Sequence, residues 1–258
     1  MSLLKRNWLQ SSVPESFDAS GAFETCRVRK GKVLHLEEHL ERLESSLRTL
    51  GFPRWEEQGA RNSLAEAVRG VKEGYVRIAV RRRGKPRVVV HRHAGIPYSK
   101  KQIRRGVSVT TVPTRVPAVE AVQTRVKSSE RLSSILARME APGVVEVLRI
   151  GPQGYLTEGT ISNLFLVKGG AVRTPPAWLG VLGGVTRSHV IEAAKRMKIP
   201  VEEIPLTRHD LFNAEEAFLT NVLMGILPIR QADGRAIGAA TPGPLTRRLM
   251  RAVEKGER

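Results

Sequence analysis

The chain has 258 residues, enough for one large domain or two modest domains, each with its own hydrophobic core. Hydrophobic residues make up 41% and charged residues 26%, as in an ordinary globular protein, and no apolar run approaches the ~20 residues that span a bilayer. The N-terminal segment lacks the apolar core of a signal peptide, and the single cysteine, Cys26, cannot form a disulfide within the chain. We therefore expect a protein of the reducing cytoplasm that does not bind membranes.

The net charge of +18 is concentrated in residues 69–105, where thirteen Lys or Arg residues face one acid, Glu73. This excess indicates either an anionic partner, such as nucleic acid or a small substrate with several carboxylates, or a solvated basic surface. The segment has two strand-like stretches about the turn RRRGK and no zinc-finger or RNA-binding aromatic motif. We expect mostly solvated surface and keep a basic nucleic-acid-binding module as a distant alternative.

The first half of the chain predicts a mixture of strands and helices. Residues 21–36 indicate two short strands with a turn at Gly31. Five leucines between residues 36 and 50 have helical spacing, and Gly51 and Pro53 end that helix. The other elements expected here are a weaker helix at 60–70, a hairpin of strands at 75–82 and 87–93, and a strand at 106–112.

Two prolines and little periodicity at 113–124 predict a linker between two domains. We place a small N-terminal α/β domain at 1–113, the linker at 114–124 and a larger C-terminal α/β domain at 125–258. The second half begins with a helix that Ser128 or Ser129 caps, with Glu130 in its first turn. Its inward face is predicted to hold Leu132, Ile135, Leu136 and Met139.

The remaining segments continue the mixture, with strands near 144–150 and 163–167, a helix from Thr186, two strands and a final helix near 244–254. Because strands and helices do not alternate strictly, we expect an α+β protein of two domains and not one doubly wound sheet.

Lys127 is the first candidate for chemistry, because it precedes the predicted helix start and follows the apolar Val126. A lysine that forms a Schiff base must lose its proton, and a helix N-terminus and desolvation both disfavour the ammonium form. Taken by itself, however, Lys127 is better explained as an ordinary surface lysine.

Glu158 lies between a turn and the apolar stretch NLFLV, at a strand edge where it could face a ligand. A carboxylate in such a place can keep the ring nitrogen of a pyridine cofactor protonated. The alternative is an exposed turn carboxylate.

A phosphate-binding site is indicated by LGGVTR, in which two glycines precede a helix that starts with Val185 and Thr186. Their amides and the helix dipole favour an anion, although most such segments are plain helix caps. Arg42 would add a cationic fork, or would pair with Glu38 on the solvent side of its helix. An amine, a carboxylate and an anion cradle together suit pyridoxal 5′-phosphate (PLP).

The order HxxRL, Lys, ExxxxN and GVTR resembles the fold-type IV PLP enzymes over almost the whole chain. These include branched-chain aminotransferases, D-amino acid aminotransferases and 4-amino-4-deoxychorismate lyases. The resemblance implies a two-domain, D-amino acid aminotransferase-like α+β fold with the cofactor in the interdomain cleft, and a homodimer. It also implies that Lys127 binds the cofactor covalently, that Glu158 pairs with the pyridine nitrogen, and that Arg42 and the amides of Val185, Thr186 and Val222 hold the phosphate.

Three segments are more similar to the lyases than to the aminotransferases: FET at 23–25, KSSERL at 127–132 and LTNVLMGILP at 219–228. We therefore expect a lyase that releases pyruvate and 4-aminobenzoate for folate biosynthesis, with an aminotransferase of branched-chain or D-amino acids as the alternative. The resemblance places a substrate-binding cation at Arg77, and Arg27 and Arg81 are further candidates. Such cations suit a small anionic, amino-acid-like substrate.

The segment from His35 to His39 matches the HxxEH pattern of inverted zinc proteases. Because it also fits a strand-to-helix junction of the resembled family, we expect no metal here.

Overall fold

The computed structural model describes residues 21–83, 85–115, 126–128 and 132–256. The chain divides into two compact units. Unit 1 comprises residues up to Ala94 together with Val126–Leu132, and unit 2 comprises Gly95–Arg125 and Ser133–Arg258. Among the described residues, no helix is both long and apolar enough to cross a membrane.

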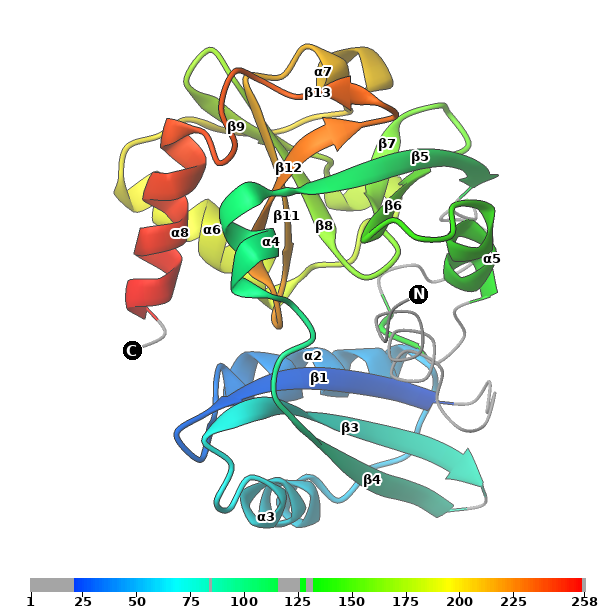
Figure 1. The fold of residues 1–258 in the computed structure, drawn as a ribbon. Helices are drawn as coiled ribbons and strands as arrows, with labels where there is room; N and C mark the ends of the chain where they lie inside the picture. The colour runs from blue at the N-terminus through cyan, green and yellow to red at the C-terminus, as the bar shows by residue number, and fades with distance from the viewer. Residues whose placement is uncertain (1–20, 84, 116–125, 129–131, 257–258) are drawn as a thin grey trace. The chain divides into compact units, whose positions relative to one another are not determined.

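Unit 1 is an antiparallel sheet covered on one face by two helices (Figure 1). Its strands run in the order β2-β1-β3-β4, and its elements are β1 (Gly21–Arg29), β2 (Lys32–Val33), α2 (Leu36–Thr49), α3 (Glu57–Ala67), β3 (Glu73–Arg83) and β4 (Lys85–Ala94). Leucines of α2 and α3 pack into one core with every second residue of β1 and β3. The predicted strands, hairpin and helices of this part are therefore confirmed.

Unit 2 is built on a nine-stranded sheet. Because β7 pairs with both β6 and β8, the strands β8-β11-β12-β5-β6-β7 form a closed circuit, from which β9 and β10 branch. The strands are β5 (Val107–Arg115), β6 (Glu146–Ile150), β7 (Leu156–Gly159), β8 (Asn163–Lys168), β9 (Ala171–Thr174), β10 (Val201–Glu203), β11 (Glu216–Asn221), β12 (Gly225–Ala232) and β13 (Arg235–Ala236).

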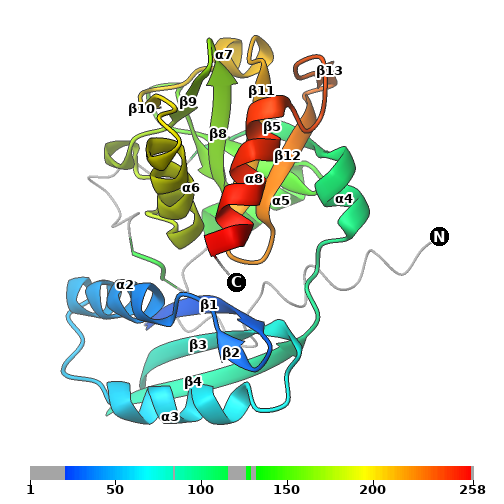
Figure 2. The same cartoon turned by 90° about the vertical axis from the view of Figure 1, so that its left-hand side faces the viewer.

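The longest helices of unit 2, α6 (Val185–Arg196) and α8 (Pro244–Gly256), lie side by side against this sheet (Figure 2). Their apolar faces share a core with Phe165 of β8 and Phe218 of β11, whose rings stack at 5.0 Å. The shorter helices are α4 (Lys100–Arg105), α5 (Leu132–Glu140), the 3-10 turn η2 (Ala177–Leu179) and α7 (Arg208–Phe212). The result is a mixed α+β protein with two sheets, as expected.

The chain does not divide where the prolines predict a boundary. Strand β5, expected at the end of the N-terminal domain, pairs in parallel with β6 and β12 and so belongs to unit 2. Lys127, expected in the larger C-terminal domain, instead groups with unit 1. Residues 116–124 of the expected linker lie outside the described residues, as do Ser129 and Glu130 of the expected helix start.

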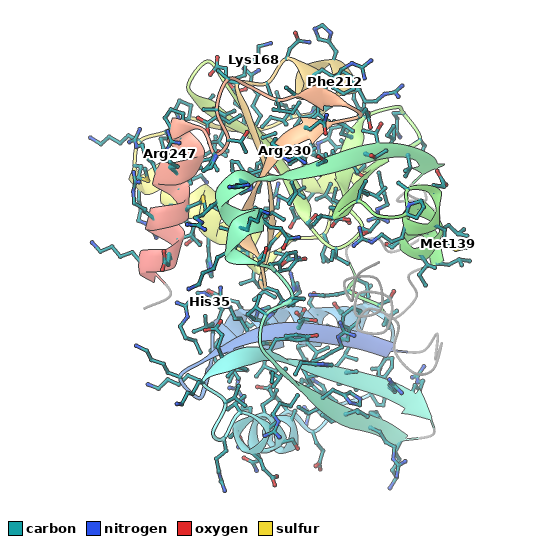
Figure 3. The ribbon with its side chains drawn as sticks, viewed as in Figure 1. His35, Met139, Lys168, Phe212, Arg230 and Arg247 are labelled. Atoms are coloured by element: carbon teal, nitrogen blue, oxygen red, sulfur yellow. The ribbon has the colours of Figure 1, made fainter. Side chains whose placement is uncertain are left out.

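The predicted inward face of α5 is wrong. Leu132, Leu136 and Met139 are 59%, 45% and 68% exposed, and Figure 3 shows Met139 on the outer side of the helix. The buried residue is Ala137, which packs against Val112 of β5. The spacing correctly predicts that these apolar residues share one face of the helix. It does not show whether other segments bury that face.

Candidate active site

Lys127 is held beside strand β1 by its backbone. The Phe23 amide donates to the Lys127 carbonyl at 3.0 Å, and Ala22 forms a bridge with Ser128. The Lys127 amide in turn donates to the Ser46 hydroxyl on α2 at 3.4 Å. Lys127 is thus positioned as an added piece of strand at the edge of unit 1, a long-range arrangement that its sequence neighbours did not indicate.

The Lys127 side chain reaches a buried carboxylate, Glu24 of β1. Lys127 Nζ lies 3.2 Å from Glu24 Oε2, and Arg42 of α2 donates from Nε and Nη2 to the two carboxylate oxygens, each at 2.7 Å. His39 Nδ1 lies 2.8 Å from Oε2. Since an ionised carboxylate only accepts hydrogen bonds, Nδ1 carries the proton and donates it to Glu24.

These contacts decide the charges in the cluster. Although burial by itself raises the pKa of Glu24, the charges of Lys127 and Arg42 and the bonds from His39 and Arg42 lower it well below its usual value. Burial also lowers the pKa of His39, which is fully buried. Glu24 is therefore an anion and His39 is neutral, so unit 1 holds a lysine and an arginine around one carboxylate.

The histidines of the HxxEH segment have carboxylate partners of their own. His39 donates to Glu24, and His35 Nδ1 lies 3.3 Å from Glu38 Oε2. Arg42 forms a bidentate pair with the buried Glu24, so Glu24 orients its guanidinium. A phosphate contact by Arg42 stays a prediction.

The three arginines expected to bind substrate share one face of the unit 1 sheet. In the antiparallel register Arg77 faces Thr25, Arg81 faces Gly21 and Arg27 faces Tyr75, on the side opposite the helices. Arg27 is already paired with Glu73 at 2.8 Å. Arg77 stacks over the Phe23 ring at 5.5 Å, has a buried Nε without a hydrogen-bond partner, and forms no ion pair with any described residue. Arg77 is therefore the best-placed of the three.

In unit 2, Glu158 lies where the strand circuit closes. Glu158 of β7 pairs directly with Asn163 of β8, and it is this register that links the two strands. Its Oε2 accepts from Asn163 Nδ2 at 3.1 Å and from the Leu182 amide at 3.0 Å, and its Oε1 accepts from Arg149 Nη2 at 2.9 Å. Both charged side chains are almost buried, at 12% and 8% exposure. The carboxylate is thus an ordered part of the sheet and not an exposed turn residue.

The start of α6 is tied to the same carboxylate. Asn163 Nδ2 also donates to the Leu182 carbonyl at 2.9 Å, which fixes the loop that precedes Gly184. A side-chain carbon at Gly184 would lie 2.1 Å from Asn163 Oδ1, so any larger residue there would displace the hydrogen-bonded Asn163 amide. The helix itself begins at Val185, as predicted, with Thr186 next and both side chains buried.

Two further clamps hold the turns of unit 2. Asn221 Oδ1 accepts from the Leu223 and Met224 amides, which fixes the turn that contains Val222, while its Nδ2 donates to the Ile161 carbonyl at 3.1 Å. The buried Glu146 carboxylate accepts from Thr160, Ile161 and Ser162 just after Glu158. The expected cofactor contacts of unit 2 therefore lie in strand β7, at the start of α6 and on the turn after β11, and side-chain hydrogen bonds fix each of these places.

No sequence motif marked Glu24, Arg149 or Glu146 as a site residue, and His39 stood out only as part of the HxxEH pattern. Glu24 was noticed only as part of the segment FET, and Arg149 lies in an apolar strand with no motif around it. Their roles depend on partners on other strands and helices. A single acid inside a strand core, such as Glu24 between Phe23 and Thr25, was the one available signal, because a buried charge needs a partner.

The chain is similar in sequence to known proteins. The sequence model of the family described as amino-transferase class IV matches residues 21–232. A putative branched-chain-amino-acid aminotransferase of Methanocaldococcus jannaschii is 34% identical over 246 residues, which cover 89% of this chain and 84% of that protein.

Two solved structures are similar in fold. The T.th. branched-chain amino acid aminotransferase, solved with pyridoxamine 5′-phosphate, has a TM-score of 0.85 and 25% identity, over 94% of this chain and 87% of that one. A putative 4-amino-4-deoxychorismate lyase of Legionella pneumophila has a TM-score of 0.82 and 26% identity, over 94% of this chain and 95% of that one.

Proposed function

Since the chain belongs to the class IV aminotransferase family, whose members are PLP enzymes, we propose that it transfers the amino group of an amino acid to a 2-oxo acid. Branched-chain amino acids are the proposed amino donors. The observation that carries this choice is the 34% identity to a branched-chain aminotransferase over most of both chains. It favours the aminotransferase alternative over the lyase that the three sequence segments had suggested.

The residues present fit PLP. Unit 1 offers an amine with 17% exposure beside an arginine, which suits an aldehyde and a phosphate. Unit 2 offers an ordered carboxylate for a pyridine nitrogen and a helix N-terminus for an anion. When bound, the cofactor supplies an electron sink for the bond that breaks at the substrate α-carbon.

In this proposal each protein group has one task. Lys127 binds the cofactor through its ε-amine and then moves the proton of the substrate α-carbon. Arg42 and the amides of Val185, Thr186 and Val222 hold the phosphate, and Glu158 holds the ring nitrogen. Arg77 binds a substrate carboxylate, because its half-buried guanidinium lies on the face of the sheet opposite the helices.

A paired product assay tests the proposal. The purified protein is incubated with branched-chain or D-amino acids plus 2-oxoglutarate, and separately with aminodeoxychorismate. We expect 2-oxo acid product in the first assay, and Lys127→Ala should lower that rate by about 100-fold or more. Product only in the second assay would establish the lyase, which stays the second candidate because the Legionella pneumophila lyase fits over 95% of its length.

The substrate role of Arg77 can be tested separately. Replacing Arg77 with Gln removes a charge-assisted contact of about 1.5–3 kcal/mol, so the KM for 2-oxoglutarate should rise about 10- to 100-fold. Arg92→Gln, which removes an exposed charge from the same hairpin, is the matched control. Equal KM values in the two variants would remove Arg77 from the substrate site.

We also propose that the protein is a homodimer. Leu132, Leu136 and Met139 expose a continuous apolar stripe on α5, and exposed patches of this kind mark interaction surfaces. Met139→Glu should shift the mass measured by sedimentation toward that of the 28.5 kDa monomer. A wild-type protein that is already monomeric would refute the proposal.

A further inference from the structure

The fully buried carboxylate of Glu24 in unit 1 contacts both Lys127 and Arg42, the two unit 1 residues that the proposed function assigns to the cofactor. Glu24 has no exposed surface, and each of its oxygens is bonded to a cationic group. Nothing in the family resemblance gives Glu24 a role, although it is the group that Lys127 and Arg42 have in common.

The cluster contains more positive than negative charge. Glu24 on β1 faces His39 and Arg42 from α2 and Lys127 from the added edge segment. His39 is neutral, and burial and the neighbouring Glu24 charge raise the pKa of the Cys26 thiol on the same strand, so the thiol is neutral too. Arg77 lies over the Phe23 ring, which Lys127 Nζ also approaches at 5.6 Å. Among the described residues, Glu24 is the anion that contacts the Lys127 ammonium.

The proton on Lys127 matters for cofactor capture. A free amine condenses with the aldehyde carbon of PLP: the nitrogen forms a bond to that carbon, and the carbonyl oxygen leaves as water. An ammonium ion has no electron pair for this step, so its proton must first pass to solvent. Any group that stabilises the ammonium form raises the pH at which capture begins.

We propose that Glu24 is a positioning residue that holds the Lys127 ammonium and the Arg42 guanidinium at fixed places, and so sets the pH at which Lys127 captures the cofactor. The inference rests on the role given to Lys127 in the proposed function. Burial and the nearby Arg42 both oppose a charge on Lys127. Glu24 is the described anion in contact with Lys127, so its removal should lower the pH at which Lys127 captures the cofactor.

Glu24→Gln keeps the side-chain shape and removes the charge. The full chain, stripped of cofactor, is incubated with PLP across a range of pH and reduced with borohydride, and the labelled lysine is found by peptide mass analysis. We expect the midpoint of capture at Lys127 to fall by about one to three pH units, the effect of one opposite charge within hydrogen-bond reach. Glu66→Gln makes the same chemical change at an exposed position of α3 and should leave the wild-type midpoint unchanged.

A conservative variant separates charge from shape. Glu24→Asp retains the anion and should give a midpoint between those of the wild type and Glu24→Gln. If Glu24→Gln and wild type share one midpoint, or if Glu24→Asp behaves as Glu24→Gln does, the inference is wrong. If borohydride fixes the cofactor to a different lysine, the role of Lys127 fails and this inference fails with it. A shared midpoint with the label on Lys127 overturns the Glu24 inference alone.

A measurement on the wild-type protein covers the case in which Glu24→Gln does not fold. An amine-acylating reagent is applied to the cofactor-free chain, with the exposed Lys100 as internal reference. Because of Glu24, we expect Lys127 to need a pH at least as high as Lys100 does. A Lys127 that reacts at a lower pH than Lys100 would show that burial and Arg42 dominate, and would overturn the inference.

Discussion

Arg149 is the residue whose replacement should disturb unit 2 most directly, because it is the buried cation beside Glu158. Removing one partner of a buried ion pair costs about 3–5 kcal/mol, since the other charge is left unpaired. Here Glu158 keeps its bonds from Asn163 and the Leu182 amide, which places the cost at the lower end of that range. The buried Arg149 Nε has no hydrogen-bond partner, which destabilises the folded state. Removing it therefore offsets about 1 kcal/mol of the loss in the free energy of unfolding. We expect Arg149→Met to lower the free energy of unfolding by about 2–3 kcal/mol.

The assay is urea unfolding followed by circular dichroism, with the midpoint compared at a constant slope. Arg48→Met is the matched control, because Arg48 pairs with Glu44 on the surface and is 79% exposed. Such a pair contributes only about 0.3–0.5 kcal/mol. The double variant Arg149→Met with Glu158→Gln removes both charges and should recover part of the loss. If Arg149→Met costs no more than Arg48→Met, the buried pair is not an important stabilising contact and the reasoning is refuted.

Three further changes test other parts of the fold. In Glu146→Gln, an amide NH₂ replaces one of the oxygens that accept hydrogen bonds from Thr160 and Ser162. The free energy of unfolding should therefore fall by about 2–4 kcal/mol, and an unchanged urea midpoint would contradict this. Gly184→Ala should cost about 1–3 kcal/mol because its Cβ meets Asn163, whereas Gly183→Ala, which has open space, should be nearly neutral in the same urea titration. Burial lowers the pKa of His39 in the folded protein, so as pH falls the unfolded chain binds a proton on this imidazole before the folded protein does. The contribution of neutral His39 to the free energy of unfolding is therefore complete above about pH 6.5 and is lost as pH falls. His39→Gln should flatten the decline in thermal stability between about pH 7 and 5.

The elements that sequence analysis predicted well are those with local signals. The leucines of α2 repeat at helical spacing and meet their core on the same face, and β3 and β4 pair as the predicted hairpin. The apolar face of α5 has an equally clear spacing but is exposed, because coverage depends on what other segments supply. Strand β5 was assigned to the wrong domain for a similar reason, since its parallel partners β6 and β12 lie far along the chain.

The candidate site shows the same limit. Lys127, Arg42 and Glu158 could be singled out by their order in a family-like pattern, and the structure places the first two on either side of one carboxylate. That carboxylate, Glu24, lies on a strand with no local marker of its role, and the Arg149 partner of Glu158 likewise comes from a different strand. Contacts that join distant segments leave no periodicity behind, so only coordinates reveal them.

Unit 1 is assembled from two separated stretches of chain, and the second stretch contributes the amine. A ribosome that has made only the first hundred residues has supplied all four strands of the smaller sheet, but not the edge segment that brings Lys127 to Glu24. A gene truncated at the proline-rich segment would therefore encode a protein in which the buried Glu24 keeps Arg42 but lacks Lys127. Any attempt to reduce this enzyme to its N-terminal half must carry Val126–Leu132 along with it.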